Sequence, residues 1–162
     1  MLTVAGTGQP KGDGSVPWVV LFFVAWLVVL FLIPVQKLKR LWPAGLVGLA
    51  AVYAIDSTFI GLGAYSYSSA GPALSGIPVF YLLSIVAGSI LLAYFRPNGS
   101  WKQLLFVLGM ALGFLLIETA MVALRYFHYL SWSTGRSFLL DVAGFIMVLW
   151  LAEKAGAAGK EP

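Results

Sequence analysis

Three acidic residues lie inside long apolar runs of the sequence: Asp56, Glu118 and Asp141. An ionisable side chain in such a run is costly in a lipid environment, so it marks a candidate functional site. Clustered carboxylates could bind a polar or cationic ligand, hold a divalent cation, or serve a membrane enzyme. The three acids are therefore the first candidates for a binding site.

Other polar side chains that could complete this site lie close to the acids in the sequence. Arg125 and Tyr129 come seven and eleven residues after Glu118, which places them along one face of a continuous helix. Tyr65 and Tyr67, which lie near the end of the second apolar run, could donate hydrogen bonds or anchor the chain at an interface. The predicted ligand-binding residues are Asp56, Glu118, Asp141, Arg125, Tyr53, His128 and Arg136. No residue is predicted to be catalytic.

The same charges also have a purely structural interpretation. Glu118 could pair with Arg125 to neutralise charge and fix the register of two helices. Asp141 could pair with Arg136 in the same way. Asp56 has no basic residue near it in the sequence, so its partner must come from another helix, or burial keeps it uncharged.

The composition identifies the class of protein. Of the 162 residues, 60% are hydrophobic and 10% are charged, whereas a soluble domain has about 45–50% apolar and about 25% charged residues. This excludes a soluble enzyme, a nucleic-acid-binding domain and a disordered chain. The chain has no cysteine and one histidine, so thiolate chemistry is excluded, a zinc site is disfavoured, and no cofactor is predicted.

Five apolar runs are long enough to be membrane spans, which need about 20 residues each. They cover residues 18–35, 42–63, 77–95, 101–124 and 137–151. Because backbone amides in lipid must pair within their own segment, each run is predicted to be a helix. The sequence therefore predicts an all-α, integral membrane bundle of five transmembrane helices over residues 18–152. A flexible arm (1–17) and a disordered tail (153–162) flank it.

The distribution of basic residues predicts the orientation of the bundle. Lys and Arg concentrate on the cytoplasmic side of a membrane protein. Seven of the ten basic residues lie in the first connection, the third connection and the C-terminal tail: Lys37, Lys39, Arg40, Arg96, Lys102, Lys154 and Lys160. The N-terminus is therefore predicted to be outside and the C-terminus cytoplasmic.

The depths of the three acids can then be estimated. Asp56 lies about 21 Å and Glu118 about 25 Å from the cytoplasmic ends of their spans, at 1.5 Å per residue. Asp141 lies about one turn from the outer end of the fifth run, at Ser137. All three fall in the outer half, which predicts a polar cup that opens outward.

Small residues recur four positions apart in several runs, as at Gly109 and Gly113 or Ala44 and Gly48. Ser84 and Gly88 have the same spacing. Such spacing lets helix backbones approach closely. It favours packing within one bundle, or a homodimer or membrane partner that binds through one of these faces.

Sequence motifs narrow the possible chemistry. All six lysines lie in loops, tails or span ends, which excludes a retinal Schiff base within a span. GxSxG, HExxH and phosphate-loop motifs are absent, as are the aspartate-rich motifs that bind diphosphate through metal. A small enzyme acting on a lipid or isoprenoid remains an alternative, because it too could use clustered acids.

Several short motifs resemble a family of small multi-pass membrane proteins of unknown function from Bacillus- and Clostridium-like bacteria. The similar segments are Ile33-Pro34 with Lys37, Lys39 and Arg40; Asp56 with 61–67; 76–78; Arg96-Pro97; Glu118; and 129–132. The likeness covers roughly residues 30–151. The chain departs from the family in its Gly/Ser-rich arm and in having fewer aromatic and basic residues near the last loop. The resemblance implies a bacterial cytoplasmic membrane protein and supplies no activity.

The leading hypothesis is a membrane-embedded binding, sensing or transport-accessory module. Its outward-facing acidic pocket would take a small polar or cationic ligand or a lipid headgroup. The first alternative is a membrane enzyme acting on a lipid or isoprenoid. The second is a structural membrane component whose charges pair internally. The predicted partners are the lipid bilayer and a second membrane chain, and no nucleic acid.

Overall fold

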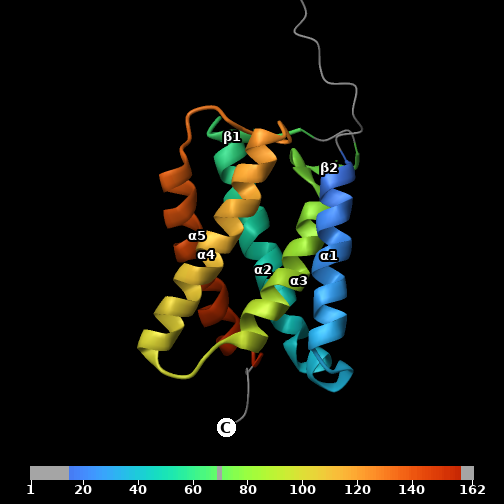
Figure 1. Ribbon diagram of the computed structural model, residues 1–162, viewed down its shortest axis with the longest axis vertical. Coiled ribbons are helices and arrows are strands. Elements are labelled where there is room, and N and C mark those ends of the chain that lie inside the picture. The colour runs from blue at the N-terminus through green and yellow to red at the C-terminus, as the bar shows by residue number, and fades with distance from the viewer. Residues whose placement is uncertain (1–14, 69–70, 158–162) are drawn as a thin grey trace, which may run out of the picture.

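The computed structural model describes residues 15–68 and 71–157, which form five helices and four short strands. The helices are α1 (Val16–Leu32), α2 (Val35–Gly61), α3 (Val79–Phe95), α4 (Ser100–Ala123) and α5 (Thr134–Lys154). They run alternately up and down in one bundle (Figure 1). The prediction of a helical bundle built from five apolar segments is confirmed. The predicted arm and tail fall mostly on residues 1–14 and 158–162, which lie outside the described ranges.

The strands lie together at one end of the bundle, which we call the strand end (Figure 1). They are β1 (Tyr65–Tyr67), β2 (Ala73–Leu74), β3 (Ile77–Pro78) and β4 (Phe127–Tyr129). β1 pairs with β4 in an antiparallel ladder, and β2 pairs with β3. The β1–β4 ladder joins the α2–α3 connection to the α4–α5 connection. No strand is predicted from the sequence, since two or three residues are too few to show an alternating pattern.

Several helix boundaries differ from the prediction. α2 begins at Val35 rather than Trp42, so Pro43 lies inside the helix and does not end the first connection. α1 ends because the residue before a proline avoids helical geometry, and Ile33 is accordingly extended. α5 runs from Thr134 to Lys154, which makes it longer than the predicted run 137–151.

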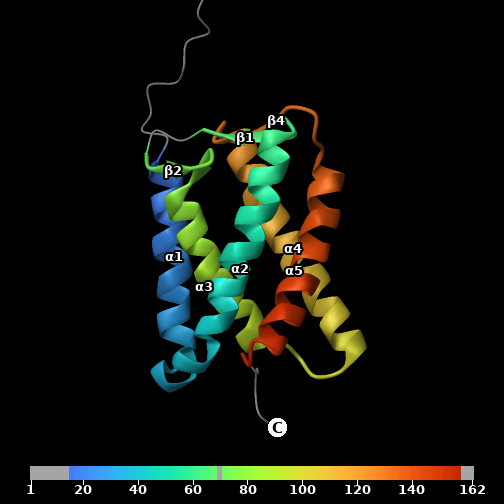
Figure 2. The ribbon, with the colours of Figure 1, turned by 180° about the vertical axis from the view of Figure 1, so that it is seen from behind.

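The helices pack in a series rather than in a closed ring. α1 packs on α3, α3 on α2, α2 on α5, and α5 on α4. Figure 2 shows α2 and α5 on the face opposite to that of Figure 1. α1 and α4, the two ends of the series, make almost no contact with each other. The bundle is therefore not sealed by helix packing between α1 and α4.

The closest helix approach, between α2 and α3, confirms part of the small-residue prediction. Ala44 is fully buried, and a Cβ atom built at Gly48 would lie 1.8 Å from Oγ of Ser89. Small residues here let the two backbones approach, as they do in membrane bundles.

We expect Gly48→Ala to lower the free energy of unfolding by about 1–3 kcal/mol, the usual cost of overpacking. The new methyl group would push α3 away from α2. Denaturant titration of the purified protein in detergent measures the change. Gly61→Ala is the matched control on the same helix, because a Cβ there meets no atom within 4 Å. Equal stability of the two variants would contradict the close packing.

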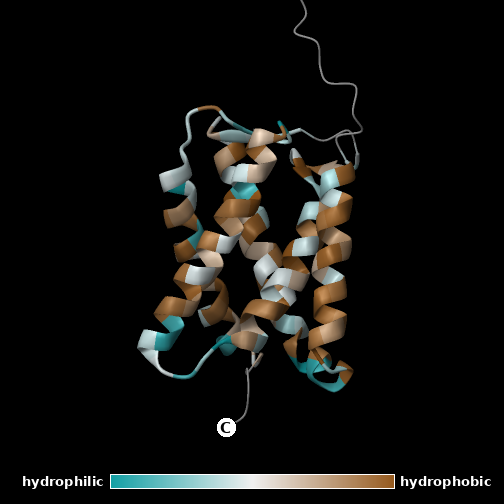
Figure 3. Cartoon of the chain, in the orientation of Figure 1, coloured by the Kyte–Doolittle hydropathy of each residue, from teal (hydrophilic) through white to brown (hydrophobic). Residues whose placement is uncertain are grey.

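The helices are mostly apolar along their length, and most hydrophilic residues lie toward the two ends of the bundle (Figure 3). Large side chains such as Phe31, Leu116 and Leu139 are 84%, 73% and 68% exposed. α2, α4 and α5 are long and apolar enough to cross a membrane. α1 and α3 are apolar helices of 17 residues each.

Candidate functional site

Asp56 is held by two tyrosines from the strand end. Its side chain lies in the second-last turn of α2, and the residue is only 7% exposed. Tyr65 donates a hydrogen bond of 2.7 Å to Oδ1, and Tyr67 donates one of 2.8 Å to Oδ2. Residues two apart on a strand point to the same face, so β1 brings both hydroxyl groups to one carboxyl. A partner from another helix, which is one of the two expectations for Asp56, is therefore not found among these donors, because both come from β1, which follows its own helix.

Both tyrosines remain hydrogen-bond donors over the ordinary pH range. Burial, followed by the nearby charge of Asp56, raises the pKa of Tyr65 well above its usual value. The same two causes raise the pKa of Tyr67. Because neither phenol loses its proton under physiological conditions, the two bonds to the carboxyl group persist.

Glu118 is bound by Tyr129 of β4, whose hydroxyl donates to Oε1. The Tyr129 hydroxyl also lies 3.4 Å from Oγ of Ser137, which accepts a hydrogen bond of 3.0 Å from Nε1 of Trp132. The network connects α4, β4 and α5. The sequence predicts that Glu118 and Tyr129 lie on one face of a continuous helix, whereas α4 ends at Ala123 and β4 folds back to make the contact.

Asp141 differs from the other two acids because its carboxyl group lacks a complete set of partners. It lies on α5, and its Oδ2 atom is buried with no hydrogen-bond partner among the described residues. A buried polar atom without a partner costs about 1–3 kcal/mol. Such an atom in a folded protein therefore needs an explanation, and a bound ligand is one.

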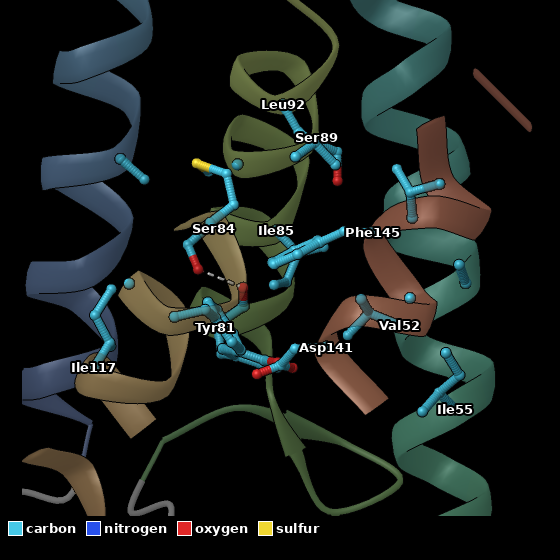
Figure 4. A pocket seen from close by; sticks show the side chains of 18 of the residues that line it. Val52, Ile55, Tyr81, Ser84, Ile85, Ser89, Leu92, Ile117, Asp141 and Phe145 are labelled. Atoms are coloured by element: carbon cyan, nitrogen blue, oxygen red, sulfur yellow. Dashed lines mark hydrogen bonds between the residues drawn. The ribbon is translucent and has the colours of Figure 1, made fainter. Parts of the chain in front are cut away.

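Asp56 and Asp141 both line a central cavity of about 390 Å³. All five helices contribute to its wall. The polar lining residues are Asp56, Tyr81, Ser84, Ser89 and Asp141. Figure 4 shows Asp141 beside Tyr81 at the end of the cavity nearer the strands, and Leu92 and Ser89 at the other end. The cavity is thus acidic at one end and largely apolar along its walls.

The cavity exists because four glycines face it: Gly88, Gly109, Gly113 and Gly144. A Cβ atom built at any of these four positions would meet no atom within 4 Å. The spacing of Gly109 with Gly113, and of Ser84 with Gly88, therefore does not reflect helix packing within this bundle. For these two pairs the packing interpretation is wrong. Their small side chains leave room in the centre of the bundle.

The strand end of the bundle is covered rather than open. Ala64, Tyr65 and Phe127 are buried there, with the rings of Phe59 and Trp132 packed against them. We call these five residues the aromatic cap. The predicted cup that opens outward is therefore not observed, because the strands fold over that end.

A second, smaller cavity of about 30 Å³ lies beneath the cap. Glu118 lines this small cavity, and it does not line the central one. Tyr81 and Leu21 line both. The three acids thus share one end of the bundle, as predicted, but only two of them share a cavity.

The other four predicted site residues do not line the central cavity. Tyr53 bonds to Oγ of Ser75 at 2.9 Å, and Nε2 of His128 lies 2.7 Å from Oγ of Ser68. Arg136 donates to the carbonyl oxygen of Ser131 at 2.9 Å. Arg125 lies in the turn between α4 and β4, with a backbone φ of 63°.

The predicted acid–arginine pairs are not formed. Within residues 15–68 and 71–157, neither Glu118 with Arg125 nor Asp141 with Arg136 makes an ion pair. An ion pair at the opposite end joins Arg96 to Glu153 at 2.8 Å. In the described ranges no group of three His, Cys, Asp or Glu side chains could hold a metal ion.

Sequence reasoning missed the polar residues of α3 that line the cavity. Tyr81, Ser84 and Ser89 carry no charge, and their run shows no acid to draw attention to it. Their only signal is that hydroxyl groups recur on a helix that is otherwise apolar. Ser84 bonds its own helix, to the carbonyl oxygen of Tyr81 at 2.7 Å (Figure 4).

No protein-family model, no curated protein and no solved structure matches this chain. A function must therefore be inferred from the site itself, since one fold carries many activities. The site consists of the cavity, its acidic end and the glycines in its walls.

Proposed function

We propose that this chain is a multi-pass membrane protein that binds a ligand in its central cavity. The binding serves sensing or accessory transport, and the ligand carries a polar or cationic group that reaches the acidic end. The observation that carries this proposal is the unpartnered, buried Oδ2 atom of Asp141 in the wall of a cavity of about 390 Å³. Ligand-binding cavities in proteins occupy about 300–1,000 Å³.

The distribution of polarity supports the membrane part of the proposal. The outer surface is apolar, whereas Asp56, Ser84 and Ser89 are buried inside the bundle. A soluble bundle has the opposite arrangement, with its apolar stripe facing inward. Exposed apolar patches of this extent mark contact with a membrane or with another chain.

The charge distribution supports an orientation with the N-terminus outside. Six basic residues of the described ranges lie at the end of the bundle opposite the strands: Lys37, Lys39, Arg40, Arg96, Lys102 and Lys154. Arg125 and Arg136 lie at the strand end. The positive-inside rule then places the strand end outside and the C-terminus in the cytoplasm. We propose a bacterial cytoplasmic membrane as its location, which is what the resemblance of its short motifs implies.

Native mass spectrometry of the protein purified in a gentle detergent tests the binding function. We expect a small molecule to remain bound to the wild-type protein. Its occupancy should fall at least tenfold in Asp141→Asn, because a carboxylate oxygen is lost at nearly constant size. Tyr53→Phe is the control, since its hydroxyl bonds to Ser75 and not to the cavity. An adduct that survives Asp141→Asn, or a wild-type protein that carries none, would contradict the proposal.

A further inference from the structure

The central cavity is closed at both ends of the bundle. The aromatic cap covers the strand end. At the other end, the side chains of Leu92, Val107, Val148 and Leu149 are buried in one apolar cluster. These residues come from α3, α4 and α5 near the ends of those helices that lie away from the strands. A ligand therefore has no open route along the bundle axis.

The cavity is open on its side, along α4. Gly109, Gly113 and Ile117 line the cavity and are exposed rather than buried, so the wall that they form is not covered by packed side chains. They lie four residues apart, so they form one face of the helix. Leu21 and Ala25 of α1 line the cavity as well, and α1 makes almost no contact with α4. The side opening thus lies between α1 and α4.

This opening faces the hydrocarbon if the helices cross a membrane as proposed. The neighbouring outer positions on both helices carry large apolar side chains, such as Leu112 and Leu116 on α4 and Val24 on α1. A molecule dissolved in the bilayer can reach such an opening, whereas a water-soluble molecule would have to cross lipid first.

The volume of the cavity limits the size of the ligand. An engineered apolar cavity of about 150 Å³ binds benzene, which has six non-hydrogen atoms. A cavity of about 390 Å³ therefore takes a ligand of roughly 15 non-hydrogen atoms. This matches one alkyl or isoprenoid chain, and it is too small for a two-tailed phospholipid.

The chemistry of the acidic end defines the head of the ligand. Two carboxyl groups line the cavity, and none of its lining residues is a Lys, Arg or His. Asp56 already accepts bonds from two tyrosines, whereas Oδ2 of Asp141 has no partner in the described part of the chain. The group that fits here is a hydrogen-bond donor, a hydroxyl or an ammonium. An acyl tail or a helix from a second copy would leave Oδ2 unpaired.

We infer that the ligand is a single-tailed amphiphile that passes from the bilayer between α1 and α4 and donates a hydrogen bond from its head to Asp141. This inference rests on the proposed binding function and names the chemical class of its ligand. The tail lies against the apolar walls, where glycines make room for it. The head lies beside Asp141 and Tyr81, at the end nearer the strands (Figure 4).

Three probes of equal chain length separate the contributions of head and tail. They are 1-tetradecanol, 1-tetradecylamine and methyl tetradecyl ether, each with a terminal CF₃ group, added to the protein in lipid nanodiscs. A ¹⁹F NMR signal distinct from that in empty nanodiscs reports the bound probe. We expect it for the alcohol or the amine, at an occupancy at least tenfold above that of the ether. The stronger of the two identifies the head.

Two variants test the contact and the route. Asp141→Asn should reduce binding of the preferred probe at least tenfold. Gly113→Phe should also reduce binding of the preferred probe at least tenfold, because its ring blocks the side opening. Gly113→Leu repeats the test if the phenylalanine ring prevents folding. Leu112→Phe is the matched control, because Leu112 is exposed on the same helix and does not line the cavity.

The results that would overturn the inference are specific. If the ether bound as well as the alcohol and the amine, a hydrogen bond from the polar head of the ligand would not contribute to binding. Unchanged binding in a folded Gly113 variant would show that the ligand does not enter between α1 and α4. A dimer that disappears in Gly113→Phe, with no probe bound, would show that a second copy occupies this face. A water-soluble, Asp141-dependent ligand found by native mass spectrometry would overturn the inference and leave the proposed function intact.

Discussion

Replacing both Tyr65 and Tyr67 by Phe is expected to lower the free energy of unfolding by about 3–5 kcal/mol. The two hydroxyl groups are the donors to Oδ1 and Oδ2 of Asp56. Without them a carboxyl group that is 7% exposed would stay buried and lose both of these donors. Removing one side of a buried polar contact costs more than the contact itself contributes, because the remaining group is not returned to water.

Unfolding in detergent, followed by tryptophan fluorescence during a denaturant titration, measures this loss. Each single Phe variant should lose less than the double variant, and the two single losses are not expected to add up to the double loss, because both tyrosines bond to Asp56. The triple variant that adds Asp56→Leu should recover part of the stability, because the carboxyl group that lost its two tyrosine donors is then absent. Tyr53→Phe is the control on α2. If the double variant were as stable as the wild type, the hydrogen bonds to Asp56 would not hold the strand end in place.

This part of the structure shows why the site could be predicted only in part. The three acids are visible in the sequence because a charge in an apolar run is rare. Tyr65 and Tyr67 can be recognised as possible donors because they follow soon after Asp56. Their bonds to it could not be predicted, since they depend on a three-residue strand whose pairing partner lies 60 to 64 positions later in the chain.

Glu118 and Tyr129 form a contact that the sequence did not predict as a pair. The spacing of eleven residues fits one helical face, but the helix ends at Ala123. The contact forms because Arg125 adopts a left-handed backbone conformation and turns the chain back into β4. A positive φ at a residue other than glycine is uncommon. Nothing in the amino-acid pattern predicts it at Arg125.

The helices themselves were predictable because hydrophobicity accumulates over about 20 residues. The ends of the helices were less predictable, as the position of Pro43 inside α2 shows. A proline inside a helix removes one hydrogen bond, and the sequence alone suggests a break there. α2 continues through it because α3 and α5 pack along it. Tertiary packing therefore overrides the local signal.

The glycines show the same ambiguity in the helix interior. Gly48 and Gly113 have the same kind of small-residue spacing in the sequence. In the fold, a Cβ at Gly48 would overlap Ser89, whereas one at Gly113 would meet nothing within 4 Å. One glycine permits close packing and the other opens a cavity. Only the arrangement of the neighbouring helices distinguishes the two roles.

The second large effect is expected from filling this cavity. The double variant Gly88→Leu and Gly144→Leu places a leucine side chain on each of two cavity walls, from α3 and α5. Together they occupy about half of the space for roughly 15 non-hydrogen atoms. We expect the occupancy of the bound ligand to fall at least tenfold. We expect the free energy of unfolding of the ligand-free protein to rise by about 1–3 kcal/mol. Leucine favours a helix over glycine by about 0.8 kcal/mol, and its side chain buries apolar surface.

Native mass spectrometry and denaturant titration of the same preparations measure the two effects. Gly135→Leu is the matched control, because Gly135 lies in the first turn of α5 and does not line the cavity. A Cβ atom built at Gly135 would meet no atom within 4 Å. It should keep the ligand. Stability and binding should thus move in opposite directions only when the new side chains point into the cavity. A double variant that keeps its ligand would show that the molecule is bound elsewhere. A variant that loses both ligand and stability would show that the glycines face packed atoms rather than open space.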